Sequence, residues 1–320
     1  MISTSRRTFL ATSIAATALA AVPAIAKTAP ANIVTTTGMI ADLVRNVGGD
    51  HVTVTALMGP GVDPHAYRQT RSDIVAMTRA DAVYYHGLYL EAQMEDFFAD
   101  LAKRLPVQAL AESTDTALLL SHEDYEGRFD PHIWMDPALW APLADEVATA
   151  LTALRPAAEA DFRANAATFK DEAKSLHIYA NTVLQSVSKE RRILVTAHDA
   201  FSYFGAAHGF EVEGIQGIST ESEAGLNRIS ALVDLLVARD VPAVFVETSV
   251  SDRNVRALIE GAAAQGHNVR IGGSLFSDAM GPEGTYEGTW LGMIDHNVTT
   301  ISRALGAEAP AAGRLGKLGS

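Results

Sequence analysis

The sequence feature that most constrains the fold is a long helical pattern at residues 157–187, which contains no glycine and no proline. The segment is rich in Ala, Glu and Lys, which are good helix formers, so it predicts one rigid helix. On both sides of it, short apolar runs typical of strands alternate with segments of helical spacing. This alternation is typical of α/β domains with largely parallel sheets. We therefore expect two α/β lobes with mainly parallel sheets, joined by a single long rigid helix.

The expected elements are distributed evenly over the two lobes. The expected strands are residues 32–36, 51–58, 81–85, 106–110, 193–196, 243–247 and 268–271. The expected helices, besides the long one, are residues 38–47, 72–79, 93–104, 137–154, 201–208, 226–239, 254–265 and 285–305. The chain thus divides into an N-terminal lobe (27–156), a linking helix (157–187), a C-terminal lobe (188–308) and a flexible tail (309–320). The link contains no Gly/Ser hinge of the kind that permits large closure.

The first 26 residues have the pattern of an export signal. Arg6 and Arg7 precede an alanine-rich apolar run, and Ala24-Ile25-Ala26 matches an A-x-A cleavage site. The paired arginines favour a twin-arginine signal, with an ordinary secretory signal as the alternative. Both signals export the protein, so we expect cleavage near Ala26 and a periplasmic location. Because the sequence contains no cysteine, we also expect no lipid anchor.

Charge and composition exclude several classes of partner and site. The formal net charge is −13 and the isoelectric point is about 5.2. Neither nucleic acid nor an anionic membrane surface is therefore an expected partner. Without cysteine, disulfides and thiolate metal sites are excluded, so any transition-metal site must be built from His, Asp and Glu.

Four such residues follow expected strands, two in each lobe: His65, His132, His198 and Asp278. In α/β proteins, ligands bind outside the carboxyl ends of the strands, where these residues lie. Three imidazoles and one carboxylate can complete a tetrahedral shell around a divalent cation. The four positions therefore predict a metal site that draws on both lobes.

Two of these three histidines follow the same Asp-Pro step. Asp63-Pro64-His65 occurs in GVDPHAY, and Asp130-Pro131-His132 occurs in RFDPHIWMDP. Proline fixes its own φ and biases the preceding residue toward extended geometry, so each step presents its histidine on a stiff arm. We hypothesise that Asp63 and Asp130 each accept a hydrogen bond from a ring N–H and orient the imidazole.

Each candidate also has an ordinary interpretation. A loop histidine is most often a surface residue, Asp-Pro is a common turn, and Asp278 fits a helix N-cap. His86 is expected to pack and His122 to be solvated in an acidic loop, while Glu247 fits either a partner of a ligand or a paired strand-end charge. The other polar candidates are expected to be structural or on the surface: His51, His177, His208, His267, His296, Glu221 and Glu223.

The candidate residues lie in motifs that resemble a known family. In chain order the motifs are GVDPHAY, GLYLE, DPHIWMDP, VTAHDAFSYFGAAHGFEVEGIQGISTESEA, VFVETSV and IGGSLFSDAMG. They resemble the metal-binding solute receptors of ABC importers for zinc and manganese, most of all TroA-like receptors, over nearly the whole mature chain. The resemblance implies one transported cation in the cleft, ligands at His65, His132, His198 and Asp278, and delivery to the permease subunits of an ABC transporter. We expect such a receptor to act as a monomer.

The identity of the metal is less constrained than the ligands. Manganese-type receptors of this family often carry Glu at the position of His198, whereas many zinc receptors carry a long histidine-rich loop where this chain has only SHEDYEGRF. Imidazole-rich sites suit zinc, and Mn²⁺ lies at the weak end of the affinity order. We therefore favour Zn²⁺ over Mn²⁺, with Fe²⁺ also open.

Two other functions compete with a receptor. A zinc hydrolase would use three histidines and an open coordination position to activate water. Against it, Asp278 closes the fourth position and the sequence contains no H-E-x-x-H motif. The third alternative is a metal-binding surface adhesin on the same fold, which the expected soluble, unanchored export disfavours.

Overall fold

The computed structural model describes residues 29–122 and 126–319. The predicted export signal at residues 1–26 lies outside the described residues. Among the helices of the described ranges, none combines the length and the hydrophobicity that crossing a bilayer requires.

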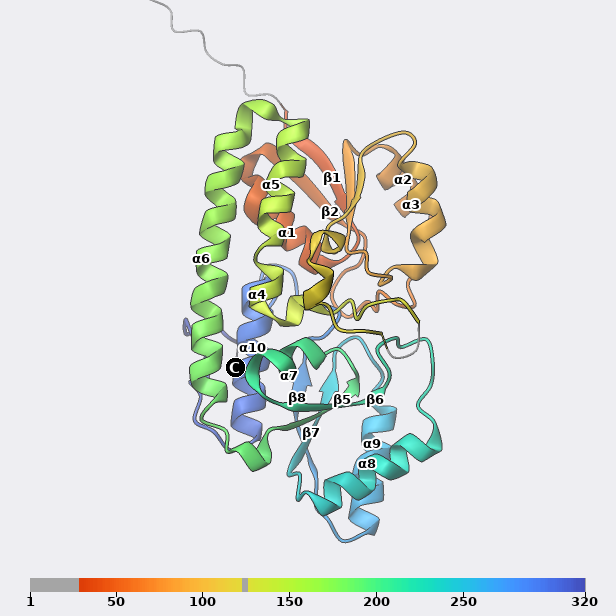
Figure 1. Ribbon diagram of the computed structural model, residues 1–320, viewed down its shortest axis with the longest axis vertical. Helices are drawn as coiled ribbons and strands as arrows, with labels where there is room; N and C mark the ends of the chain where they lie inside the picture. Colours follow the sequence, from red (N-terminus) through yellow and green to blue (C-terminus); the bar gives the residue numbers. More distant parts are fainter. Residues whose placement is uncertain (1–28, 123–125, 320) are drawn as a thin grey trace, which may run out of the picture.

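The N-terminal part of the chain forms a four-stranded parallel sheet in the order β2-β1-β3-β4. Its strands are β1 (Ala31–Thr35), β2 (Val52–Ala56), β3 (Ala82–Tyr85) and β4 (Val107–Ala109). Helices α1 (Gly38–Gly48) and α5 (Leu143–Leu154) lie on one side of this part, and α2 (Arg71–Thr78) and α3 (Glu95–Leu101) lie on the other (Figure 1). Because all pairings are parallel, the strands end at the same edge of the sheet.

The C-terminal part repeats the α/β architecture with two parallel pairs, β5-β6 and β7-β8, and β5 lies beside β7. The strands are β5 (Ile193–His198), β6 (Glu211–Gln216), β7 (Ala243–Glu247) and β8 (Arg270–Leu275). The helices are α7 (Ser202–His208), α8 (Leu226–Ala238), α9 (Arg253–Ala264) and α10 (Trp290–Ala304). The mixed α/β class with parallel sheets is thus confirmed.

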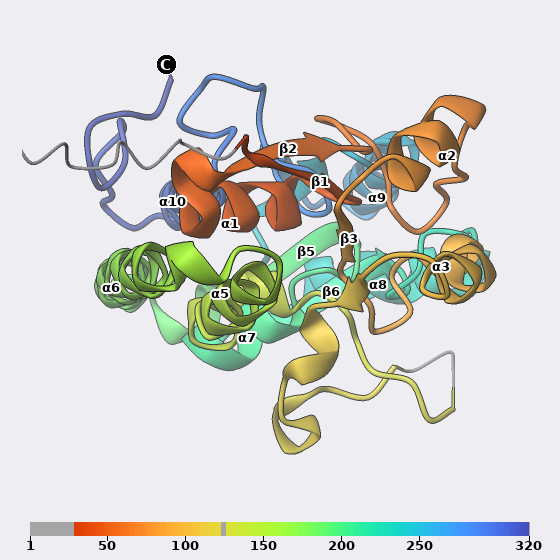
Figure 2. The same cartoon turned by 90° about the horizontal axis from the view of Figure 1, so that it is seen from above.

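Helix α6 (Glu159–Leu184) is the long helix predicted from the sequence. Its 26 residues span roughly 39 Å at 1.5 Å per residue. Its buried residues recur every three or four positions: Phe162, Ala166, Phe169, Ala173, Leu176, Ala180 and Val183. This stripe packs on α1 and α5 of the N-terminal part and on α10 of the C-terminal part. Figures 1 and 2 show α6 along one side of the molecule with α10 beside it, so one rigid element supports both lobes.

Two local predictions are wrong for identifiable reasons. The single helix expected at 137–154 is two helices, α4 (Pro137–Trp140) and α5, because Pro142 has no N–H to continue the hydrogen-bond ladder. Strand β6 was not predicted, because its alternating glutamates and its glycine disguise an edge strand. Gly214 in this strand allows close approach of the chain, since a Cβ there would lie 2.5 Å from the backbone nitrogen of Asp199.

The predicted domain boundaries and the flexibility of the tail stay predictions. Residues near the C-terminus do make contacts: the backbone N–H of Arg314 donates to both carboxylate oxygens of Asp295, at 3.0 and 2.9 Å.

Candidate metal centre

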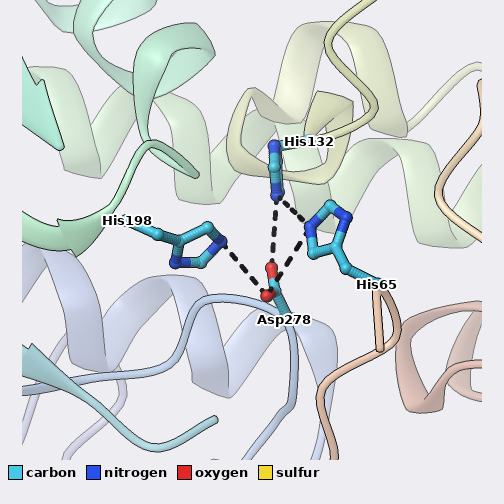
Figure 3. A group of neighbouring side chains, drawn as sticks. All are labelled: His65, His132, His198 and Asp278. Carbon is cyan, nitrogen blue, oxygen red and sulfur yellow. Dashed lines mark hydrogen bonds and ion pairs between the residues drawn. The ribbon is translucent and has the colours of Figure 1, made fainter. Parts of the chain in front are cut away.

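The four predicted residues converge between the two lobes (Figure 3). They are His65 in the loop after β2, His132 at the start of a short 3₁₀ helix (Ile133–Met135), His198 as the last residue of β5, and Asp278 in the loop after β8. One potential ligand atom from each lies within 4.8 Å of all the others. All four side chains are buried. Residues from separate loops and both lobes therefore meet at one point.

The three imidazoles present Nε2 to this point. Nε2 of His132 lies 3.3 Å from Oδ1 of Asp278, and Nε2 of His198 lies 3.1 Å from Oδ2. Nε2 of His65 lies 3.3 Å from Nε2 of His132 and 3.9 Å from the Asp278 carboxylate. Both Asp278 oxygens and Nε2 of His198 are nevertheless buried without a hydrogen bond among the described residues. Buried polar atoms are normally satisfied, and a cation at this point would satisfy them together.

The far sides of two imidazoles are fixed by carboxylates. Nδ1 of His132 lies 2.7 Å from Oδ1 of Asp130, and Nδ1 of His198 lies 2.5 Å from Oε2 of Glu247. Such carboxylate–histidine pairs fix the tautomer that leaves Nε2 free for a metal. The ring-orienting hypothesis is confirmed for Asp130, and Glu247 is a partner of a candidate ligand.

The same hypothesis is wrong for Asp63. Its Oδ1 accepts the backbone N–H of His65 at 2.9 Å, and its Oδ2 accepts the Thr220 hydroxyl at 2.5 Å. Thr220 belongs to the C-terminal half, so Asp63 ties the two halves together instead of orienting the imidazole ring. The sequence of the turn gave no sign of Thr220, because the contact joins segments far apart in the chain.

Burial and carboxylates determine the protonation of the cluster. Burial lowers the pKa of His65 to about 3. Burial also disfavours a charged His132, but Asp130 and Asp278 outweigh it and raise the pKa of His132 to about 9. Burial opposes charge on Asp278 as well, yet His198 and His132 hold the pKa of Asp278 well below its usual range. The site therefore stabilises positive charge beside Asp278, as a cation site must.

The other histidines of the described residues do not join the cluster. His86 is fully buried as expected, and its Nε2 bonds the carbonyl of Pro131 at 2.7 Å. His122 was expected to be solvated but is only 7% exposed, and its backbone N–H donates to the carbonyl of Arg128 at 2.9 Å. The rest lie at helices or chain turns away from the four residues: His51, His177, His208, His267 and His296.

In the described part of the chain, two α/β lobes enclose a buried cluster of potential metal ligands, which is the arrangement of a metal-binding solute receptor. The family model of the periplasmic zinc-uptake complex component A, ZnuA, matches residues 33–304. The chain belongs to this ZnuA/TroA-like family of substrate-binding components of metal ABC transporters.

Two relatives and one solved structure illustrate the similarity. The chain is 44% identical over 274 residues to the manganese-binding lipoprotein MntA of Bacillus subtilis, covering 85% of this chain and 89% of that protein. It is 44% identical over 273 residues to the zinc-binding protein TroA of Treponema pallidum, covering 85% and 88%. The solved structure of the periplasmic zinc-binding TroA from Treponema pallidum matches with a TM-score of 0.84 and 43% identity, over 86% of this chain and 99% of that one.

The predicted location without a lipid anchor is contradicted by these comparisons. MntA of Bacillus subtilis is named a lipoprotein, and so are the more distant FimA of Streptococcus parasanguinis and PsaA of Streptococcus mitis, both 28% identical. The prediction depended on the absence of cysteine from the sequence, whereas these relatives carry the names of lipoproteins.

Proposed function

We propose that this protein binds one divalent transition-metal cation through His65, His132, His198 and Asp278, with Zn²⁺ preferred over Mn²⁺. The observation that carries the proposal is the set of buried, inward-facing ligand atoms within 4.8 Å of one another, several of them without a hydrogen bond. The chain would deliver the cation, as a monomer, to the permease subunits of an ABC importer. Fe²⁺ is a third ion for the same site.

The donor set supports zinc over manganese. Three imidazole nitrogens and one carboxylate oxygen match a closed tetrahedral zinc site. Mn²⁺ binds more weakly than zinc to a given set of nitrogen and oxygen donors and prefers oxygen-rich shells. The relatives are divided on this point, since TroA is named for zinc and MntA for manganese. The preference for zinc therefore depends on the chemistry of the donors.

The same donor set argues against a hydrolase. A catalytic zinc keeps one coordination position for water, whereas here the Asp278 carboxylate would occupy the fourth coordination position. The relatives carry the names of metal-binding and substrate-binding proteins and not of enzymes. Capture and release also suit the architecture: with residues 157–187 as a stiff link between lobes 27–156 and 188–308, release would require the permease to disturb the lobe interface.

A competitive titration tests the proposal. Demetallated mature protein is exposed to Zn²⁺ and Mn²⁺ together, and the bound metal is quantified by elemental analysis. We expect one equivalent of zinc, held against excess manganese, and loss of this zinc in Asp278→Ala. Asp295→Ala is the matched control, because Asp295 is also a buried aspartate but lies outside the cluster. Retention of manganese in the presence of zinc would overturn the zinc preference, and binding of neither would overturn the function.

A further inference from the structure

Three buried aromatic side chains donate hydrogen bonds from one lobe to the backbone of the other, next to the candidate ligands. The indole N–H of Trp134 donates to the carbonyl of Ser277 at 2.9 Å. The hydroxyl of Tyr203 donates to the carbonyl of Asp130 at 2.9 Å. The indole N–H of Trp290 donates to the carbonyl of Trp134 at 3.0 Å. All these contacts cross the interface between the lobes.

The first two contacts are reciprocal. Trp134 follows the ligand His132 in the N-terminal lobe, and its acceptor Ser277 directly precedes the ligand Asp278 of the C-terminal lobe. Tyr203 lies on α7, shortly after His198, and its acceptor is Asp130 in the Asp-Pro-His step of the other lobe. Each lobe therefore holds a ligand loop of its partner lobe by a backbone carbonyl.

These bonds are shielded from water and well satisfied. Trp134 and Trp290 are fully buried and Tyr203 is 2% exposed. The Tyr203 hydroxyl also accepts the backbone N–H of Leu120 at 2.9 Å, so both of its hydrogen-bonding functions are used within the interface. The ring of Trp134 lies edge-on to the imidazole of His132, with centroids 5.1 Å apart. Separating the lobes would break these bonds and move the two ligand loops apart.

We propose that Trp134 and Tyr203 are positioning residues that keep the ligand loops of opposite lobes assembled before a metal arrives, and that they thereby control how fast the metal leaves. The inference rests on the proposed function of metal capture. A site assembled in advance loses less freedom on binding and binds more tightly. Neither residue touches the cation; each acts through the backbone beside a ligand.

The chain offers matched controls for both side chains. Trp140 and Tyr84 are also buried, and neither the indole nitrogen of Trp140 nor the hydroxyl of Tyr84 has a hydrogen-bond partner among the described residues. Trp134→Phe is therefore compared with Trp140→Phe, and Tyr203→Phe with Tyr84→Phe. Each pair removes the same atoms from a buried ring, but only one member of each pair loses a bond between the lobes.

The first measurement is the rate of zinc release into a chelator, followed by stopped flow. A single hydrogen bond is worth a factor of roughly three to ten, so we expect Trp134→Phe and Tyr203→Phe to release zinc about three- to tenfold faster. The association rate and the absorption spectrum of the Co²⁺-loaded protein should stay unchanged, because the four ligands remain. The control variants should stay within about twofold of the wild-type rate. Wild-type release rates in both test variants, or equal acceleration in the controls, would overturn the proposal.

The second measurement separates this inference from the proposed function, because it uses metal-free protein. Hydrogen exchange of the Trp134 indole N–H is followed by NMR in Tyr203→Phe and Tyr84→Phe. We expect faster exchange only in Tyr203→Phe, since loss of one bond loosens the interface that protects the other. If the wild-type protein binds no zinc but this difference is found, the function fails and the positioning of the loops stands. If zinc binds and the two variants exchange alike, the function stands and the positioning role fails.

Discussion

The two Asp-Pro-His steps begin with the same turn and end in different environments. In each step the aspartate Oδ1 accepts the backbone N–H of the histidine at 2.9 Å. In the second step the same Oδ1 also lies 2.7 Å from Nδ1 of His132. In the first step the Asp63 carboxylate accepts a hydrogen bond from the Thr220 hydroxyl across the lobe interface, and not from the ring of His65. The same Asp-Pro-His sequence therefore makes the same hydrogen bond to the backbone in both steps, while distant residues determine what else the carboxylate contacts.

The difference reaches the charge of the two histidines. With no carboxylate hydrogen-bonded to its ring among the described residues, His65 has its pKa lowered by burial to about 3. The pKa of His132 is raised to about 9, because Asp130 and Asp278 outweigh the same burial. One arm thus offers a neutral imidazole held by its backbone, and the other offers an imidazole polarised by a carboxylate. Predictions that contrast the arms test this view.

The largest expected effect is the loss of either histidine. If both arms supply a ligand, His65→Ala and His132→Ala should each weaken zinc binding by roughly 1,000-fold or more, beyond the 10–100-fold typical of a lost outer partner. The control is His208→Ala, which removes a buried imidazole whose one side-chain hydrogen bond within the described ranges is to Asn181. The zinc affinities are measured by chelator competition. Near-wild-type binding by His65→Ala would mean that only the second Asp-Pro-His step supplies a metal ligand.

The next prediction concerns a buried aspartate, Asp42, whose pKa shows the effect of burial without the influence of an imidazole. Asp42 also accepts a backbone N–H, from Trp290 at 3.0 Å, but no imidazole hydrogen-bonds it among the described residues. Burial raises the pKa of Asp42 from 3.8 to about 6, so the folded protein favours the protonated carboxyl. The stability that this protonation contributes is complete below pH 4 and is lost as the pH rises through 6. This difference of about two pKa units corresponds to about 3 kcal/mol.

Asp42→Asn should therefore gain stability relative to the wild type between pH 4 and pH 7, by up to about 3 kcal/mol. Urea unfolding of the metal-free proteins at the two pH values measures the difference. Parallel pH profiles for the two proteins would show that ionisation of Asp42 carries no cost.

A smaller effect contrasts the two aspartates directly. Asp130→Asn keeps the shape but removes the charge behind His132, so zinc affinity should fall by roughly tenfold. Asp63→Asn should change it by less than about threefold, because the Asp63 carboxylate does not touch an imidazole nitrogen. Chelator competition on both variants gives the comparison. Equal losses, or a larger loss for Asp63→Asn, would contradict the distinction between the arms.

The smallest effect concerns the partner of Asp63. Thr220→Val removes the hydroxyl that bonds Asp63 across the interface while keeping the size of the side chain. We expect a loss of about 1 kcal/mol in unfolding free energy and nearly unchanged zinc affinity. Urea unfolding and metal titration of the same sample measure both. A large loss of zinc affinity would mean that this contact, and not only Trp134 and Tyr203, holds the site together.

The convergence of the four candidate ligands could be predicted because it follows from chain topology. Each residue lies at the end of a parallel strand or in a segment that comes after one. Parallel strands end at the same edge, so His198 at the end of β5 and Asp278 after β8 are brought together without any detailed packing. The long helix could be predicted for a similar reason, since composition and the lack of glycine and proline determine it locally.

The contacts behind the ligands could not be predicted because they depend on tertiary packing. Nothing in DPH distinguishes Asp63 from Asp130, and the acceptors of Trp134 and Tyr203 are backbone carbonyls that leave no mark in the sequence. His122 is buried although its local sequence is acidic, so the sequence alone does not reveal its burial. Glu247 could be found as a candidate from its place at the end of a strand, but its partner could not.

The most direct test of the account is the structure of the zinc-loaded protein, with zinc located by anomalous diffraction. We predict one zinc bonded to Nε2 of His65, His132 and His198 at about 2.0–2.1 Å and to an Asp278 oxygen at about 2.0–2.2 Å. Asp130 should remain on Nδ1 of His132, and Asp63 should remain on Thr220. A zinc ion bound elsewhere, or bound without His65, would contradict the account that the two Asp-Pro-His steps supply one metal centre.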